Sequence, residues 1–112
     1  MIEEYNFGQI KIKGKIYTSD VIIYLDKVDG NWWRKKGHLL LPQDLKEIIK
    51  EKPDILVIGT GNSGLMKIPP STKQWVESQE IKLIDAATKK ACFIYNQLSK
   101  STQVIAALHL TC

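Results

Sequence analysis

One stretch of the chain limits its fold more than any other. Residues 55–71 read ILVIGTGNSGLMKIPPS, and the first four of them are all apolar. A short, continuous apolar run that ends at glycine is typical of a strand buried on both faces. Such a strand needs a covering layer on each side, so the run predicts an α/β fold with three layers.

The glycines after this strand raise the question of nucleotide binding. Residues 59–64 read GTGNSG, which matches the G-x-G-x-x-G pattern of dinucleotide-binding proteins. In those proteins the glycines open a long helix whose N-terminus holds the phosphates. Here Pro69 and Pro70 follow too soon, and would cut such a helix to about two turns. We therefore expect the glycines to shape a turn, and we expect no dinucleotide or other cofactor.

A small anion or a small molecule remains the alternative ligand for this loop, because exposed amides in a turn can hold an anion. The carboxyl ends of parallel strands are also where open α/β sheets bind ligands. The alternative function is therefore a binding protein or an enzyme with its site at this loop, and the candidate residues are Gly59, Thr60, Gly61, Asn62 and Ser63.

The periodicity of the remaining sequence predicts a β-rich first third followed by alternating helices and strands. Strands are expected at residues 7–13 and 21–28, with Asp29-Gly30 as a hairpin turn to a partner strand at residues 31–35. Helices are expected to begin at Pro42, at Ser71 in a capping box, and after Asp85 as a cap. Further strands are expected at residues 54–59, 81–84 and 103–110.

Together these elements predict one α/β domain that spans residues 1–112. We expect a three-layer arrangement, with helices on both faces of a mixed β-sheet and an N-terminal β-hairpin region. The connector between the glycines and the second helix argues against a Rossmann topology.

Composition narrows the functional classes. The net charge of +4 comes from lysines interleaved with acidic residues, which is typical of a solvated surface, so nucleic-acid binding is not expected. The apolar runs are too short to span a membrane, and the acidic N-terminus does not resemble a signal peptide. We expect a cytoplasmic protein whose two cysteines, Cys92 and Cys112, are not joined in a disulfide.

No residue pattern identifies an enzyme or a metal site. His109 and Cys112 have suitable ligand types, but residues three apart on a strand point to opposite faces. No cysteine or histidine stands in a recognisable nucleophile context. We therefore assign no catalytic residues and no metal ligands.

The pair Trp32-Trp33 is the most distinctive surface signal. On the expected hairpin strand the two rings point to opposite faces, so one must lie on the surface or against a partner, unless a loop or helix covers both. Arg34, Lys35 and Lys36 follow directly. Aromatic and basic residues together favour a protein interface, and single-stranded nucleic acid is the weaker alternative.

Several segments together resemble a known family of small single-domain proteins. They are FGQIKIKG (7–14), NWWRKKGH (31–38), LVIGTG (56–61), Ser71-Thr72, KKACFIYN (89–96) and AALHLTC (106–112). The family includes the adipogenesis-associated domain protein of animals and a mitochondrial respiratory complex I assembly factor, with compact prokaryotic members.

The resemblance implies a three-layer α/β fold around a mixed sheet, without Rossmann topology. It also implies that the glycines at 59 and 61 are retained and that Gly64 is not a general feature. It supplies no established enzymatic activity and no catalytic residues. Since the best-described member acts by association with other proteins, we expect this chain to act through a protein partner, as a monomer or weak homodimer.

Overall fold

The centre of the protein is a five-stranded mixed sheet. The computed structural model describes residues 1–112. The sheet has the strand order β5-β4-β8-β6-β7. Its strands are β4 (Val21–Ile23), β5 (Val28–Asp29), β6 (Ile55–Thr60), β7 (Lys82–Ala86) and β8 (Val104–His109). β6 runs parallel to β7 and β8, whereas β4 runs antiparallel to β5 and β8.

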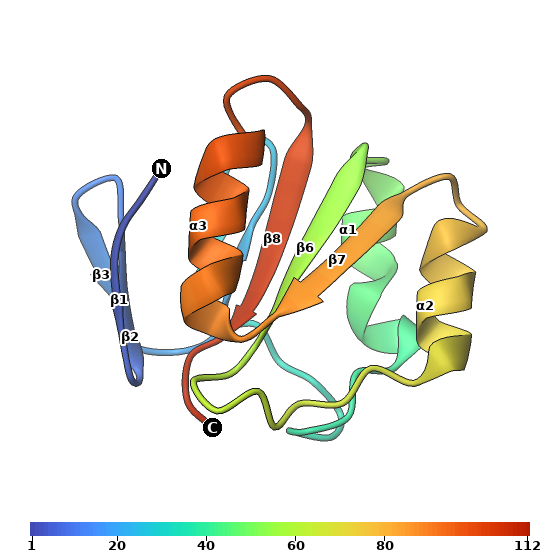
Figure 1. The fold of residues 1–112 in the computed structure, drawn as a ribbon, viewed down its shortest axis with the longest axis horizontal. Helices are drawn as coiled ribbons and strands as arrows, with labels where there is room; N and C mark the ends of the chain where they lie inside the picture. Colours follow the sequence, from blue (N-terminus) through green and yellow to red (C-terminus); the bar gives the residue numbers. More distant parts are fainter.

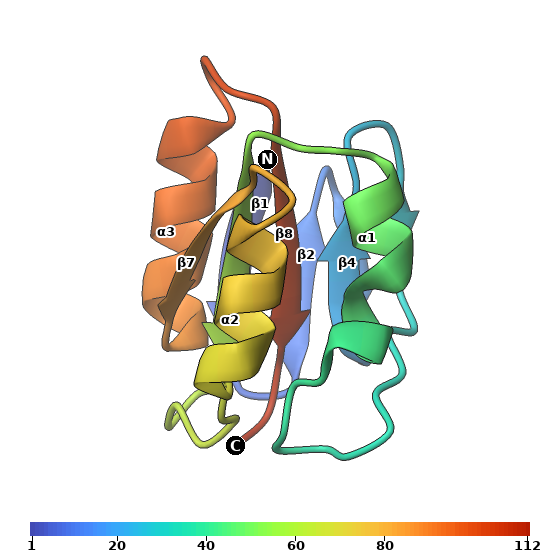
Figure 2. The same ribbon diagram turned by 90° about the vertical axis from the view of Figure 1, so that its right-hand side faces the viewer.

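Both faces of this sheet are covered. One face carries α1 (Lys46–Lys50), which continues a 3₁₀ turn η1 (Pro42–Leu45), and α2 (Pro70–Glu77). The other face carries α3 (Thr88–Leu98), and beside it a second, antiparallel sheet of β1 (Ile2–Asn6), β2 (Gln9–Ile12) and β3 (Lys15–Tyr17). Figure 1 shows this small sheet next to α3, and Figure 2 shows the central sheet between α3 and α1. The predicted three-layer α/β class is confirmed.

The apolar run in β6 is explained by this arrangement. Leu56 and Ile58 belong to the core under α1 and α2, whereas Val57 belongs to the core under α3. All three side chains are fully buried, and burying a side chain of this size contributes about 1.5–3 kcal/mol. None of the three helices is long and apolar enough to cross a bilayer.

The predicted hairpin at Asp29-Gly30 was wrong. β4 ends at Ile23, a turn closed by the Tyr24 N–H to Lys27 carbonyl bond follows, and β5 is the return strand. Residues 31–35 form no strand. Gly30 does not have positive φ, and a Cβ there would lie 2.7 Å from the Tyr17 ring. This glycine therefore permits close packing and does not form a type I′ turn.

The N-terminal strands also differ from the expectation. Residues 2–6 form β1, for which no strand was predicted, and Phe7-Gly8 is the turn into β2. The expected strand at residues 7–13 is therefore shorter at both ends. The β-hairpin region is a three-stranded meander, in which β2 pairs with both neighbours.

Two predicted helix caps were wrong. The N-cap of α2 is Pro69, with Pro70 in the first turn and no capping bond from Ser71. Proline already has the φ angle that the first helical turn needs, so the helix begins one residue before the serine. Asp85 lies within β7, and the N-cap of α3 is Ala87. The first turn of α3 instead presents Thr88, whose hydroxyl donates to the His109 carbonyl at 2.6 Å.

Candidate functional site

The loop after β6 is held tightly against the end of the chain. Gly61 and Gly64 have φ of +109° and +69°. The Gly61 amide donates to the Thr88 hydroxyl at 2.9 Å, and the Asn62 amide donates to the Thr111 carbonyl at 2.6 Å. The Gly64 amide donates to the Gly61 carbonyl at 3.2 Å. These three amides already have partners within the protein, so they are not free to hold an anion.

The glycines also allow close packing at this position. A Cβ on Gly61 would collide with the backbone carbonyl of Cys112 and lie 2.9 Å from the His109 ring. A Cβ on Gly59 would lie 2.8 Å from Leu108 and 2.9 Å from the Thr88 hydroxyl. Among the other candidates Thr60 is buried, and its hydroxyl donates to the Ala86 carbonyl at 3.1 Å. Asn62 and Ser63 are exposed.

A cleft of about 420 Å³ opens beside this loop at the carboxyl ends of β6 and β7. Its lining residues are Thr60, Gly64, Met66, Lys67, Ile68, Pro70, Lys73 and Asp85. Lys67 and Lys73 therefore lie near the loop, and neither was a predicted site residue. Their positions depend on the connector and on α2, whose start the sequence did not place correctly.

A largely buried ionic cluster joins three segments that are distant in the sequence, and one of its members, His109, lies next to Gly61 of the loop. The Asp20 carboxylate accepts from the Arg34 guanidinium at 2.9 Å, from the His109 Nδ1 at 2.8 Å, and from the Leu110 amide at 2.8 Å. Arg34 also donates to the Gly37 carbonyl at 3.0 Å. The cluster therefore fastens the start of β4, the segment after Trp33 and the end of β8.

The chemistry of Asp20 determines the state of its neighbours. An ionised carboxylate only accepts hydrogen bonds, so the 2.8 Å contact with Asp20 assigns a proton to His109 Nδ1. The Arg34 Nη2 lies 3.1 Å from the same nitrogen, which cannot accept from it while it carries that proton. The His109 Nε2 and the Arg34 Nη1 are buried without a partner. Burial alone would raise the pKa of Asp20, but the bonds from His109 and Leu110 and the charges of His109 and Arg34 lower it below its ordinary value. The surroundings of Asp20 thus favour its ionised form in the native protein.

Arg34 was a predicted site residue, whereas Asp20 was not. Arg34 was expected on a basic surface, yet it is 9% exposed and belongs to the cluster. Lys35 and Lys36 are exposed. Asp20 comes directly before an apolar strand, and the antiparallel pairing of β4 with β8 brings it to His109. The contact between Asp20 and His109 could not be predicted without knowledge of this strand pairing.

The two adjacent tryptophans have opposite surroundings. Trp32 is 7% exposed, its ring lies under the Arg34 guanidinium at 4.5 Å, and its indole N–H donates to the Asp44 carbonyl at 3.4 Å. Trp33 is 75% exposed. One exposed ring was expected, although the hairpin used to argue for it does not exist.

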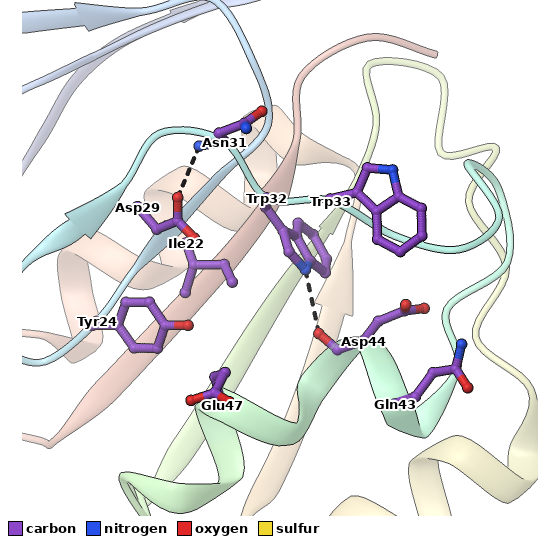
Figure 3. A pocket seen from close by; sticks show the side chains of 9 residues that line it. All are labelled: Ile22, Tyr24, Asp29, Asn31, Trp32, Trp33, Gln43, Asp44 and Glu47. Atoms are coloured by element: carbon purple, nitrogen blue, oxygen red, sulfur yellow. Dashed lines mark hydrogen bonds between the residues drawn. The ribbon is translucent and has the colours of Figure 1, made fainter.

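Trp33 stands at the edge of a cleft of about 370 Å³, shown in Figure 3. We call it the Trp33 cleft. It is lined by Ile22, Tyr24, Asp29, Asn31, Trp32, Trp33, Gln43, Asp44 and Glu47. These residues come from β4 and the residue that follows it, from β5 and the segment after it, and from η1 and α1. The acidic residues of the cleft could not be recognised from the local sequence, because they come from two separate parts of the chain.

The fold defines a class: small three-layer α/β proteins with a mixed five-stranded sheet and a second, three-stranded sheet beside α3. Residues 2–109 match the family model described as "Protein of unknown function (DUF498/DUF598)". The chain belongs to this family. The predicted membership of a small family of unknown molecular function is thereby confirmed.

Solved structures share the fold over the whole chain. The conserved hypothetical protein PH1505 from Pyrococcus horikoshii OT3 is 30% identical, with a TM-score of 0.86 over 100% of this chain and 99% of that one. The protein MT938 is 26% identical, with a TM-score of 0.84 over 100% and 98%. A Mth938-like domain protein from Bordetella pertussis is 15% identical, with a TM-score of 0.70 over 98% and 85%. The last likeness concerns the fold alone.

Proposed function

We propose that this protein acts by association with a partner protein, and that Trp33 is the centre of the contact. The observation that carries the proposal is the 75% exposure of this ring at the edge of a cleft. Tryptophan is enriched among the residues that dominate binding energy at interfaces. When a partner covers a large exposed aromatic ring next to a cleft, the burial of its apolar area contributes strongly to the free energy of binding.

The backbone on either side of Trp33 is anchored. The Trp32 amide donates to the Asp20 carbonyl at 2.8 Å, and its ring lies in the core. Arg34 is held by the Asp20 carboxylate and the Gly37 carbonyl. Trp33 is therefore presented by a fixed segment, which lowers the entropy that a partner must overcome to order it. Lys35 and Lys36 extend the polar edge of this surface.

A photo-reactive amino acid at position 33 tests the proposal in the native cell. The matched control is position 93, because Phe93 is another exposed ring, at 65%, and lies on α3. We expect one discrete cross-linked protein from position 33 and none in common with position 93. The partner is then identified and purified for a direct binding measurement.

In that measurement Trp33→Ala should weaken the complex by about thirtyfold, the effect of a strong interface residue. Phe93→Ala should leave affinity unchanged. No specific cross-link at position 33, or equal affinity of the Trp33→Ala variant, would contradict the proposal.

The second candidate function is binding of a small anionic molecule in the cleft beside the Gly59–Ser63 loop. The cleft of about 420 Å³ with Lys67 and Lys73 favours it. Inorganic phosphate is the simplest probe, and its binding is measured through the changes in amide chemical shifts during a titration. Saturable shifts around Thr60 that disappear in Lys67→Gln/Lys73→Gln, but not in a Lys82→Gln control, would support this function. Shifts that spread evenly over all exposed lysines would count against it.

A further inference from the structure

We propose that the Trp33 cleft receives a positively charged side chain, a lysine ammonium or an arginine guanidinium, from a basic segment of the partner. The inference rests on the proposed association through Trp33, and it specifies the chemistry of that partner. It follows from the charge of the cleft, from its aromatic wall and from one hydroxyl without a hydrogen-bond partner.

The cleft is acidic on a chain that is basic as a whole. Three of its nine lining residues, Asp29, Asp44 and Glu47, are carboxylates, and none is a lysine or arginine. The chain as a whole has a net charge of +4. A second hollow of about 350 Å³ shares Tyr24, Asp29 and Glu47 with the cleft and adds Lys27, Val28 and Glu51, so its carboxylates outnumber its one ammonium. The local charge is therefore opposite to that of the molecule, and it attracts cations.

The carboxylates of the cleft are not neutralised by cations within the chain, with one exposed exception. Asp29 accepts only from the Asn31 amide, at 2.9 Å. The Asp44 carboxylate accepts only from two backbone amides, at 2.9 and 3.2 Å. Glu47 pairs with Lys50 at 3.1 Å, but both side chains of that pair are exposed, where such a pair is weak. Negative charge is thus available to a ligand.

Tyr24 presents a polar group to the cleft. The residue is 8% exposed, its hydroxyl points into the cleft in Figure 3, and the hydroxyl oxygen has no hydrogen-bond partner within the chain but stays accessible to solvent. Burial raises the pKa of Tyr24, and the charges of Asp29, Glu47 and Glu51 raise it further. The hydroxyl therefore faces a negative field and is free to accept a hydrogen bond from a cationic donor.

The aromatic rings indicate where the cation would lie. Lys27 already places its ammonium 5.2 Å from the centre of the Tyr24 ring. Arg34 covers the Trp32 ring in the same way. The exposed Trp33 ring has no such cation, and tryptophan is the strongest cation–π acceptor among the side chains. A cation between Trp33 and the carboxylates would contact both kinds of group.

Other occupants fit the cleft less well. A phosphate or nucleic-acid strand would be repelled by three carboxylates. A wholly apolar segment would remove those carboxylates from water without pairing them, which is costly. A volume of about 370 Å³ accommodates a long side chain and not a larger element. Charge complementarity thus selects a basic side chain.

A peptide titration followed by ¹H–¹⁵N spectra tests the cleft without the native partner. The probe is an N-acetylated, C-amidated tetralysine peptide, and the controls are the same peptide with acetylated side chains and a tetraglutamate peptide. The indole N–H of Trp33 is the reporter, and the indole of Trp75 on α2 is the internal reference. We expect saturable shifts at Trp33 with tetralysine only.

Two pairs of substitutions distinguish specific binding of the peptide in the cleft from general electrostatic attraction between the peptide and the protein. Asp29→Asn/Glu47→Gln should weaken tetralysine binding by about tenfold, as expected for two charge contacts at a partly exposed site. Glu77→Gln/Glu80→Gln makes the same change in net charge at exposed positions at the end of α2, and it should weaken binding by less than about twofold. Equal weakening by both pairs, or shifts with the acetylated peptide, would overturn the inference.

The two proposals fail separately. In one outcome the partner cross-links at position 33, but neither Asp29→Asn/Glu47→Gln nor added salt changes its affinity. The proposed association is then supported, and the inference of a basic segment is overturned. If tetralysine binds specifically but position 33 captures no partner, the cleft chemistry stands and the association is contradicted.

Discussion

The carboxylate of Asp20 and the imidazole of His109 are 89 residues apart in the chain, yet they meet at 2.8 Å inside the protein. The antiparallel pairing of β4 with β8 brings the start of one strand to the end of the other. Arg34 completes the cluster from a segment that belongs to neither strand. A single carboxylate thus holds together three parts of the chain, and two of them, β4 and the segment of Trp33, contribute residues to the Trp33 cleft.

Removing this carboxylate should strongly destabilise the fold. Asp20→Ala leaves the Arg34 guanidinium buried without its counter-charge, and breaking a buried pair in this way costs about 3 kcal/mol or more. Urea unfolding at neutral pH measures the change in free energy of unfolding. Asp26→Ala is the control, because Asp26 is exposed and makes no side-chain hydrogen bond, and it should change stability by less than about 0.5 kcal/mol. Similar stability of both variants would contradict our account of the cluster.

The same carboxylate should make stability depend on acid pH. The pKa of Asp20 in the folded protein lies below its ordinary value of 3.8, so the unfolded chain takes up the proton first as pH falls. The stabilisation from Asp20 is therefore fully present above that ordinary value and is lost as pH falls through the lower folded-state pKa. Urea midpoints from about pH 6 to about pH 2 should fall less steeply for Asp20→Asn than for the natural chain. Parallel curves would show that Asp20 is not the group responsible.

The layers of the fold could be predicted because local patterns determine them. The apolar run of β6 has a side chain for each covered face, and Pro42 and Pro53 bracket the η1–α1 helix. The hairpin at Asp29-Gly30 was wrong because a turn-forming pair of residues does not reveal a neighbour such as the Tyr17 ring. The capping box at Ser71 failed for a similar reason, since the proline before it starts the helix.

The candidate site could be predicted from the sequence less well than the layers of the fold. One exposed ring at Trp32-Trp33 was expected, but its cause is tertiary: the Trp32 amide binds the Asp20 carbonyl and its ring enters the core. Tyr24 and Asp44 reach the Trp33 cleft from different elements, and neither carries a local signal of that role. Strand order and register, which single-sequence patterns do not contain, bring these side chains together.

Gly61 should tolerate no side chain. Its φ of +109° strains any other residue, and a Cβ would collide with the Cys112 backbone carbonyl. Gly61→Ala should cost more than about 1 kcal/mol in urea unfolding. Gly37→Ala is the matched control, because φ there is not positive and a Cβ meets nothing within 4 Å. If Gly61→Ala were as stable as the control while losing a ligand, the loop would be a binding element and not a structural turn.

The two cysteines should differ in reactivity. Cys92 is buried on α3, and burial raises the pKa of its thiol to about 12, so little thiolate is available. Cys112 is exposed. With a thiol-specific reagent at neutral pH we expect one fast equivalent from Cys112, and a second only after unfolding in urea. The Cys112→Ser variant isolates the buried thiol, and rapid labelling of that variant would show that α3 opens readily.

Replacing each tryptophan in turn should separate stability from binding. Trp32 fills the core between η1 and the sheet, so Trp32→Ala should cost about 3–5 kcal/mol. Trp33 is covered by nothing in the chain, so Trp33→Ala should change stability by less than about 0.5 kcal/mol. Urea unfolding of both variants measures this difference. A large loss of stability in Trp33→Ala would mean that the exposed ring supports the fold. A neutral result is what the proposed association requires, because a ring that contacts a partner need not support the fold.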